Sequence, residues 1–140
     1  MKTNTLNFTE QDAIKEVMDG YINALLFTSI DDNGLPLDKN YSKKNITPDS
    51  MIDIYRFCKK FYKKNAELVA EYVECYEKSL DLLGHELCMT SNRHGCGFWE
   101  MSGKFEALGE KLTEASHDMG DNSFVEGKNK TLIWMGTTND

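Results

Sequence analysis

The feature that most constrains the fold is the spacing of apolar residues between Thr47 and Ser79. These residues recur at steps of three and four, which keeps them on one face of a helix. They are Met51, Ile54, Cys58, Phe61, Leu68, Tyr72 and Cys75. Thr47 followed by Pro48 is typical of a helix start. The pattern predicts one long helix over 48–79, with a break at Asn65, the polar residue on the stripe, as the alternative.

An earlier stretch predicts a second amphipathic helix. Thr9 is a typical N-cap, and Asp12 occupies the third helical position, where a carboxylate stabilises a helix start. The apolar stripe that follows also has helical spacing. It consists of Ile14, Val17, Met18, Tyr21, Ile22, Leu25 and Leu26. Gly20 costs about 1 kcal/mol relative to alanine inside a helix, so this helix needs a partner surface.

Residues 29–46 are predicted to form a loop. The segment contains an Asp-Asn-Gly turn and Pro36, and both disfavour a continued helix. A loop of this length is uncommon in a compact domain unless it serves a purpose. Its DDNG stretch resembles the start of a calcium loop, but the acid spacing and closing glutamate of an EF-hand are missing, so calcium is not expected.

The C-terminal half has the pattern of short strands. The runs HELCMTS and GFWEM flank a glycine-bearing turn and predict a β-hairpin over 84–100. Helical spacing returns from Phe105 to Ala115, with Gly120 as a stop. A second hairpin is predicted to turn at residues 127–130.

Together these elements predict an α+β fold. N-terminal helices, one of them long, pack with a small antiparallel sheet of two hairpins and an intervening helix. The length fits a single domain over 1–140, in which 1–7 and 136–140 are expected to fray.

The charge is unevenly distributed along this acidic chain of net charge −7. Residues 35–64 hold eight Lys or Arg and three acids, whereas residues 65–140 hold six Lys or Arg and fourteen acids. This polarity is able to orient a partner, although a solvated helix surface gives the same pattern. Binding to nucleic acid is not expected of this acidic chain, because positive charge is what favours contact with the phosphates.

Nothing in the sequence predicts a membrane segment or a secretory signal. The longest apolar run, residues 24–27, is far shorter than a membrane span. The first ten residues lack the apolar region of a signal peptide. We therefore expect a cytoplasmic protein, in which the four cysteines, Cys58, Cys75, Cys88 and Cys96, are free thiols.

Four metal-ligand residue types lie close together in HELCMTSNRHGC. They are His85, Cys88, His94 and Cys96. Their spacing differs from that of zinc sites built from two separated knuckles. A nucleophilic pair of Cys96 and His94 would need apposition in space, which proximity on one strand does not provide. We predict no metal, no cofactor and no catalytic residue.

The same segment is a candidate binding turn. Gly95 and Gly97 allow main-chain amides to approach an anion or a ring. Polar side chains at the apex and an aromatic surface nearby would suit a nucleotide or another flat anionic ligand. The predicted site residues are His85, Asn92, Arg93, His94, Gly95, Gly97, Trp99 and Glu100. The alternative is a structural turn held by its own aromatic residues and by Asn92.

The chain resembles a widespread group of small uncharacterised proteins of bacteriophages and prophages. The group carries G-H-[DE], then T-x-N-x-H-G-x-G-F-W-[DE], then L-G-x-x-L-T-x-A, and the resemblance runs over residues 22–134. The matching residues are Gly84, His85, Glu86, Thr90, Asn92, His94, Gly95, Gly97, Phe98, Trp99, Glu100, Leu108, Gly109, Leu112, Thr113 and Ala115. Cys88 and Cys96 depart from the pattern, which argues further against zinc. The resemblance implies a viral origin and a location in the host cytoplasm.

Three functional hypotheses follow. The first is a phage accessory protein that binds a host component stoichiometrically, a host protein or a small anionic signalling molecule, as in anti-defence. The second is a small enzyme or nucleotide-binding domain that uses a His/Asn site in the predicted 84–100 hairpin. The third is a virion or assembly component. The many aromatic residues of the predicted long helix also suggest a homodimer; they are Tyr55, Tyr62, Tyr72 and Tyr76.

Overall fold

The computed structural model describes residues 9–76, 79–93, 97–101 and 103–136. Within these residues the chain has an α+β fold of α-helices and one two-stranded sheet. The helices are α1 (Glu10–Thr28), α2 (Pro48–Lys64), α3 (Ala66–Tyr76), α4 (Leu80–Ser91) and α5 (Glu106–His117). The strands are β1 (Asn122–Glu126) and β2 (Leu132–Gly136). Short 3-10 helices are η2 (Leu37–Lys39), η3 (Lys43–Asn45), η4 (Phe98–Glu100) and η5 (Gly103–Phe105).

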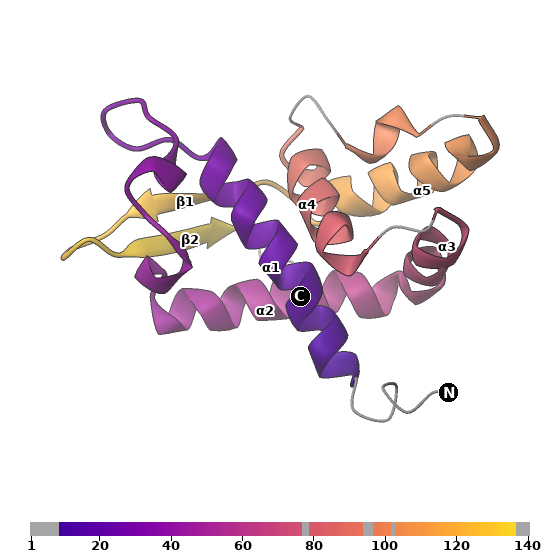
Figure 1. Cartoon of the computed structure of the whole chain (residues 1–140), viewed down its shortest axis with the longest axis horizontal. Coiled ribbons are helices and arrows are strands. Elements are labelled where there is room, and N and C mark those ends of the chain that lie inside the picture. The colour runs from indigo at the N-terminus through magenta and orange to yellow at the C-terminus, as the bar shows by residue number, and fades with distance from the viewer. Residues whose placement is uncertain (1–8, 77–78, 94–96, 102, 137–140) are drawn as a thin grey trace.

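Helix α1 is the central element and begins as predicted. Thr9 Oγ1 accepts from Asp12 N at 3.1 Å, and Thr9 N donates to Asp12 Oδ2 at 3.1 Å, which forms a capping box. The helix crosses α2, with the hairpin on one side of it and α4 on the other (Figure 1). Its predicted apolar stripe is buried in a core cluster that takes residues from every α-helix and from both strands.

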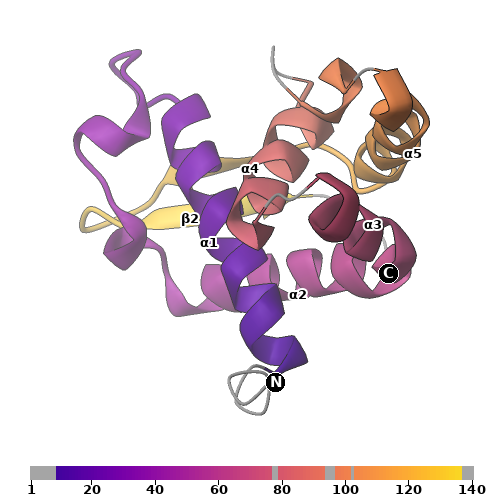
Figure 2. The same cartoon turned by 45° about the vertical axis from the view of Figure 1, so that its right-hand side comes forward.

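Helices α1 and α4 approach each other at two glycines. A Cβ on Gly20 would lie 1.7 Å from Asp81 O, and a Cβ on Gly84 would lie 1.8 Å from Val17 O. Real side chains never approach a backbone atom that closely, so each helix lies directly on the backbone of the other. The two helices stay side by side in both cartoon views (Figure 2). The partner surface that Gly20 requires is therefore α4.

The prediction of one long helix over 48–79 was wrong, and the break at Asn65 is correct. Helix α2 starts as predicted, because Thr47 Oγ1 accepts from Ser50 N at 3.2 Å. At its end, Asn65 Nδ2 donates to Phe61 O at 3.0 Å. Asparagine in this position competes with the regular helix ladder, so the chain leaves the axis of α2 before α3 begins.

The predicted hairpin over 84–100 was also wrong. Leu83, Leu87 and Cys88 are buried at helical spacing within α4, which continues to Ser91. The short run HELCMTS is compatible with a strand or with a buried helix, and packing against α1 favours the helix. Residues 97–101 then form a turn with a 3-10 segment.

The second hairpin and the helix before it are confirmed. Helix α5 is followed by Gly120 at φ 86°, and β1 pairs antiparallel with β2, with Phe124 opposite Trp134. In the turn, Asn129 and Lys130 have φ values of 59° and 58°. Consecutive left-handed residues give a turn whose twist matches that of the strands.

The two faces of the hairpin differ. Phe124, Leu132 and Trp134 point inward and are buried, and the Trp134 ring packs edge-on against Phe57 at 5.4 Å. The other face is exposed and largely apolar. It carries Ser123, Val125, Ile133 and Met135.

The outer edge of β2 is closed by the start of α2. Trp134 N donates to Ser50 Oγ at 2.9 Å, and Thr47 N donates to Leu132 O at 3.1 Å. A buried serine thus satisfies a strand amide that would otherwise need another strand.

The described part of the chain ends at Gly136, and its helices do not have the character of membrane spans. Residues 1–7 and 137–140, which were expected to fray, lie outside the described residues, and Gly136 is the last residue of β2. Among the helices of the described residues, none combines the length and apolarity that crossing a bilayer requires.

Candidate functional site

A buried hydrogen-bond network joins α1, α4 and both strands. Trp134 Nε1 donates to Tyr21 Oη at 2.9 Å, and Tyr21 Oη donates to Asn122 Oδ1. Asn92 Nδ2 donates to Asn122 Oδ1 and to Cys88 O, both at 3.0 Å, and Asn92 Oδ1 accepts from Asn122 N at 2.7 Å. The whole Asn92 amide is therefore occupied, and it fixes the end of α4 to the start of β1.

The α4–α5 connection is also fixed to the core by the contact of Thr90, in α4, with Phe98. Phe98 N donates to the buried Thr90 Oγ1 at 3.0 Å. The Phe98 ring is fully buried and meets the Tyr72 ring edge-on at 5.7 Å. Tyr72 Oη in turn donates to Glu86 Oε1. The connection is thus held by the core at Asn92 and at Phe98.

Helix α5 approaches this connection at Gly109. A Cβ there would lie 2.6 Å from Phe98 O and 2.8 Å from Met101 Cβ. Thr113 Oγ1 donates to Gly109 O at 2.7 Å within the helix. The L-G-x-x-L-T pattern therefore has a packing role: the glycine admits the neighbouring turn.

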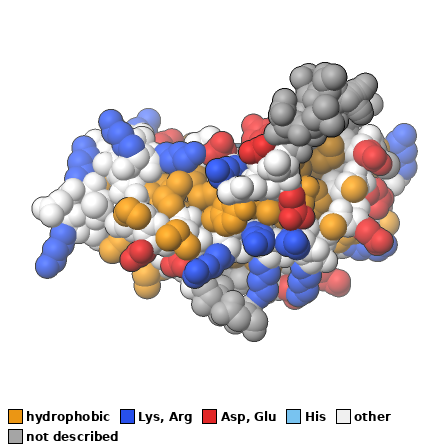
Figure 3. All heavy atoms as spheres, turned by 90° about the horizontal axis from the view of Figure 1, so that it is seen from below, with side chains coloured by type: hydrophobic (Ala, Val, Ile, Leu, Met, Phe, Trp, Pro, Cys, Tyr) orange, Lys and Arg blue, Asp and Glu red, His pale blue; other side chains and the backbone are white. Residues whose placement is uncertain are grey.

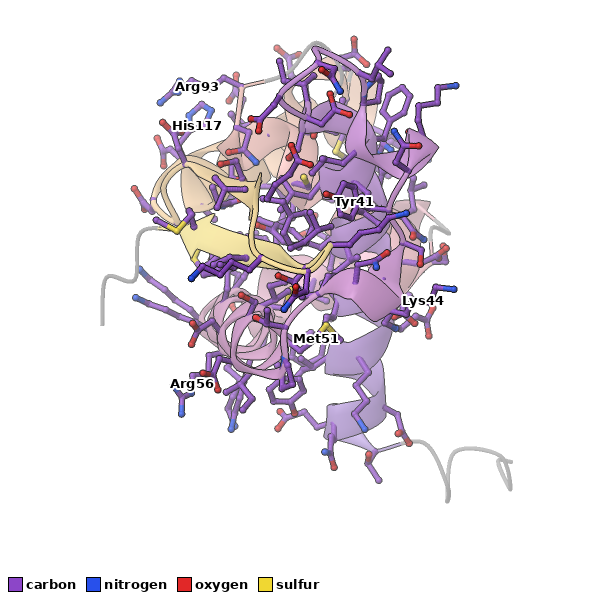
Figure 4. All side chains as sticks on the ribbon, turned by 90° about the vertical axis from the view of Figure 1, so that its left-hand side faces the viewer. Tyr41, Lys44, Met51, Arg56, Arg93 and His117 are labelled. Carbon is purple, nitrogen blue, oxygen red and sulfur yellow. The ribbon has the colours of Figure 1, made fainter. Side chains whose placement is uncertain are left out.

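Among the described residues, the predicted site residues His85 and Asn92 are not brought together. His85 is half-buried and lies seven residues before Asn92, about 10 Å along the helix axis. Asn92 has no free amide group, as described above. Arg93 is exposed with φ 59°, and its side chain points away from the body of the protein (Figure 4).

The remaining predicted residues divide into three groups. Gly97 is buried, with extended backbone at φ 179°, a conformation that any residue adopts, so no left-handed turn requires glycine at this position. Glu100 is exposed. Trp99 lies in η4, and its side chain is outside the described part of the chain, as are His94 and Gly95 entirely.

A groove of about 550 Å³ runs along the outer edge of β1. On that edge, Phe124 N donates to Ser29 Oγ at 3.4 Å, beside the 2.7 Å bond from Asn122 N to Asn92. Both polar and apolar residues line the groove. It is lined by Leu25, Thr28, Ser29, Ile30, Asn92, Asp121, Asn122, Ser123, Phe124 and Met135.

Two side chains of the groove are conspicuously exposed. Ile30 is 64% exposed and Met135 is 55% exposed. Met135 lies both in the groove lining and on the exposed hairpin face, so the groove and that face adjoin each other. The charged residue in the lining is Asp121, and no lysine or arginine of the described residues contributes to it.

Carboxylates gather at the turn end of β1. Asp32 N donates to Glu126 Oε1 at 2.9 Å, and Tyr41 Oη donates to Glu126 Oε2 at 2.6 Å. The hydrogen bond to Glu126, with the nearby charges of Asp31 and Asp32, raises the pKa of Tyr41 to about 12. Lys130 Nζ lies 5.8 Å from the centre of the Tyr41 ring, so three carboxylates face one ammonium here.

Two of the cysteines are buried free thiols. Burial raises the pKa of Cys88 to about 12, against weaker opposing hydrogen bonds from Asn92 and Thr28. Burial raises the pKa of Cys58 still further. Such thiols remain protonated at neutral pH and are poor nucleophiles. The side chains of Cys75 and Cys96 lie outside the described residues.

Metal ligands do not converge within the described residues. No three His, Cys, Asp or Glu side chains among them are arranged to hold an ion. A hollow of about 480 Å³ on α5 is lined by Glu106, Glu110, Glu114 and His117, among others. Within the described residues, His117 Nε2 is buried without a hydrogen-bond partner.

Sequence reasoning missed most residues of the groove. Ile30 lies 91 positions before Asp121 and 105 positions before Met135, and no motif connects them. The signal that was present is the length of the 29–46 loop, whose first residues form one wall of the groove. Neither a protein-family model, nor a curated protein, nor a solved structure matches the chain.

Proposed function

We propose that this protein is a phage-type accessory protein that acts by stoichiometric binding of a host protein in the host cytoplasm. The contact surface is the β1 groove together with the exposed hairpin face. An anti-defence role would follow if the bound protein belongs to a host defence system.

One observation carries the proposal: exposed apolar side chains gather where the groove adjoins the hairpin face, at Met135. Ile30 and Met135 are more than half exposed, and Val125 and Ile133 are 42% and 38% exposed. Burying such side chains contributes about 25 cal/mol for each Å² of apolar surface removed from water. Clustered exposed apolar side chains with a polar rim are typical of protein interaction sites.

The groove favours a protein partner over the small anionic ligand that the sequence suggested. A binding site for an anion is normally lined by cations or free main-chain amides. Here the charged residue of the described lining is Asp121, and the amides of Asn122 and Phe124 already donate to side chains.

The catalytic alternative has less support from the site. A general base needs a reacting group within hydrogen-bond reach. The Asn92 amide is occupied by the network, and His85 is two helical turns away from it. Turnover of a nucleotide by the purified protein would contradict the binder hypothesis.

The test is capture from a lysate of the bacterial host on immobilised protein. We expect one host protein to be recovered in stoichiometric amount by the wild type. Recovery should fall at least tenfold with the double variant Ile30→Ser/Met135→Ser and stay unchanged with Ile52→Ser, a matched control on α2 that is 50% exposed. Equal losses with both variants would contradict a specific surface, and recovery only from purified virions would favour the assembly alternative.

A further inference from the structure

We propose that the β1 groove receives an extended segment of the partner in which apolar side chains alternate with lysine or arginine. This inference rests on the proposed function, because it names the chemistry of the partner at the same surface. Three observations carry it: the position of the groove, its apolar walls and the charge around it.

The groove lies on a side of β1 that no other strand of the described residues occupies. It follows the outer edge of β1, where the neighbouring element is the loop after α1 and not another strand. Residues at alternate positions of an extended chain point to the same side. A segment lying along β1 can therefore direct every second side chain toward Ile30 and Met135, and the others toward solvent and the rim.

The walls of the groove supply apolar contact at both sides. Ile30 stands on the loop wall and Met135 on the hairpin wall, with the buried Phe124 between them. Methionine is flexible and adapts its shape to different apolar partners. One or two aliphatic side chains of the partner thus suffice to cover both residues.

The rim selects the charge of the partner. Asp121 lies at one end of β1, and Asp31, Asp32 and Glu126 lie toward the other. Lys130 offsets part of this charge near Tyr41, which lies beside the hairpin in Figure 4. In the cluster around Tyr41, the carboxylates of Asp31, Asp32 and Glu126 outnumber the Lys130 ammonium, and such a local excess of negative charge attracts a basic segment and repels an acidic one.

The basic surface of the protein lies elsewhere. Arg56, Lys59, Lys63 and Lys64 are exposed on α2, and lysine and arginine side chains gather along that helix in the view from below (Figure 3). Helix α2 packs against the β2 side of the hairpin, opposite the edge that carries the groove. An acidic partner would be drawn to α2, so the choice of a basic segment is specific to the groove.

The experiment titrates fluorescein-labelled peptides against the purified protein and measures fluorescence anisotropy. The probes are KVKVKVK, the acidic counterpart EVEVEVE and the polar counterpart KSKSKSK. We expect KVKVKVK to bind at least tenfold more tightly than either counterpart. Its affinity should fall at least fivefold with Ile30→Ser/Met135→Ser and about twofold with the charge variant Asp32→Asn, and remain unchanged with Ile52→Ser. Circular dichroism verifies that each variant is folded.

The outcomes separate this inference from the proposed function. Equal binding of KVKVKVK and EVEVEVE, or an equal loss with Ile52→Ser, overturns the inference. If host capture depends on Ile30 and Met135 while no probe binds selectively, the partner chemistry is wrong and the proposed function stands. Selective binding of KVKVKVK without capture of any host protein supports the groove chemistry and overturns the proposed function.

Discussion

Helix α4 and the hairpin both pack on α1, but the two contacts differ in how closely the backbones approach and in what they leave exposed. At the crossing, Gly20 and Gly84 bring the helix backbones into direct contact. The hairpin buries Phe124 and Trp134 and leaves Val125 and Ile133 exposed on its other face. The motif around Gly84 therefore contributes to the packed scaffold, whereas the exposed apolar surface lies on the hairpin, outside the motif.

The largest effect is expected at the crossing. Gly84→Ala places a Cβ 1.8 Å from Val17 O, so α1 and α4 must separate and the core between them loses its packing. We expect a loss of at least about 3 kcal/mol in the free energy of unfolding, measured by urea denaturation. Gly103→Ala is the control, because its Cβ meets no atom within 4 Å and only its φ of 65° opposes the substitution. A loss for Gly84→Ala no larger than that of the control would contradict the crossing.

The polar network should give the next largest effect. Asn92→Ala removes the acceptor for Asn122 N and the donor to Cys88 O. Leaving buried polar groups unpaired costs about 1–3 kcal/mol. Asn23→Ala, an exposed position on α1, should be close to neutral. Thermal unfolding of both variants checks this, and equal stability would mean that Asn92 is free for another role.

Alkaline pH tests the burial of ionisable groups on α1, α2 and α4. The raised pKa values of Cys58, Cys88 and Tyr21 mean that these groups keep their protons in the folded chain and lose them earlier in the unfolded chain. The contribution of each cysteine is complete below about pH 9 and that of Tyr21 below about pH 10, and each is lost as pH rises further, by up to about 1.4 kcal/mol per pH unit. The free energy of unfolding, measured between pH 7 and 10.5, should show a shallower decline for Cys88→Ala. An unchanged slope would contradict the burial of this thiol.

The smallest effect is expected on the exposed hairpin face. Val125→Thr and Ile133→Thr keep the strand preference of β-branched residues and remove exposed apolar surface. We expect the free energy of unfolding to change by less than about 0.5 kcal/mol. A larger loss, measured by urea denaturation, would mean that this face contributes to folding and is not available to a partner.

Local signals predicted part of the fold correctly. The capping box of Thr9 and the Thr47-Pro48 start describe interactions within a few residues, and both are present. The hairpin turn at 127–130 likewise depends on local chemistry. These predictions succeed because the stabilising partners are neighbours in the sequence.

Long-range packing explains what the sequence could not reveal. Residues 84–91 are helical because Gly84 packs against α1 at Val17, sixty-seven positions before it. Asn92 was predicted as a site residue, and its side chain hydrogen-bonds Asn122, thirty residues later, in the lining of the groove. The groove depends on the 29–31 segment meeting β1, a contact for which the long loop was only an indirect signal.

Hydrogen–deuterium exchange of the protein alone and in complex with its captured host partner tests the central claim most directly. The claim is that the scaffold and the binding surface are different regions. We predict slower exchange on binding for residues 29–32 and for β1, and no change in the amides of α1 and α4 that are buried at the crossing. Protection confined to α2 or α5, with unchanged exchange in β1, would contradict the account.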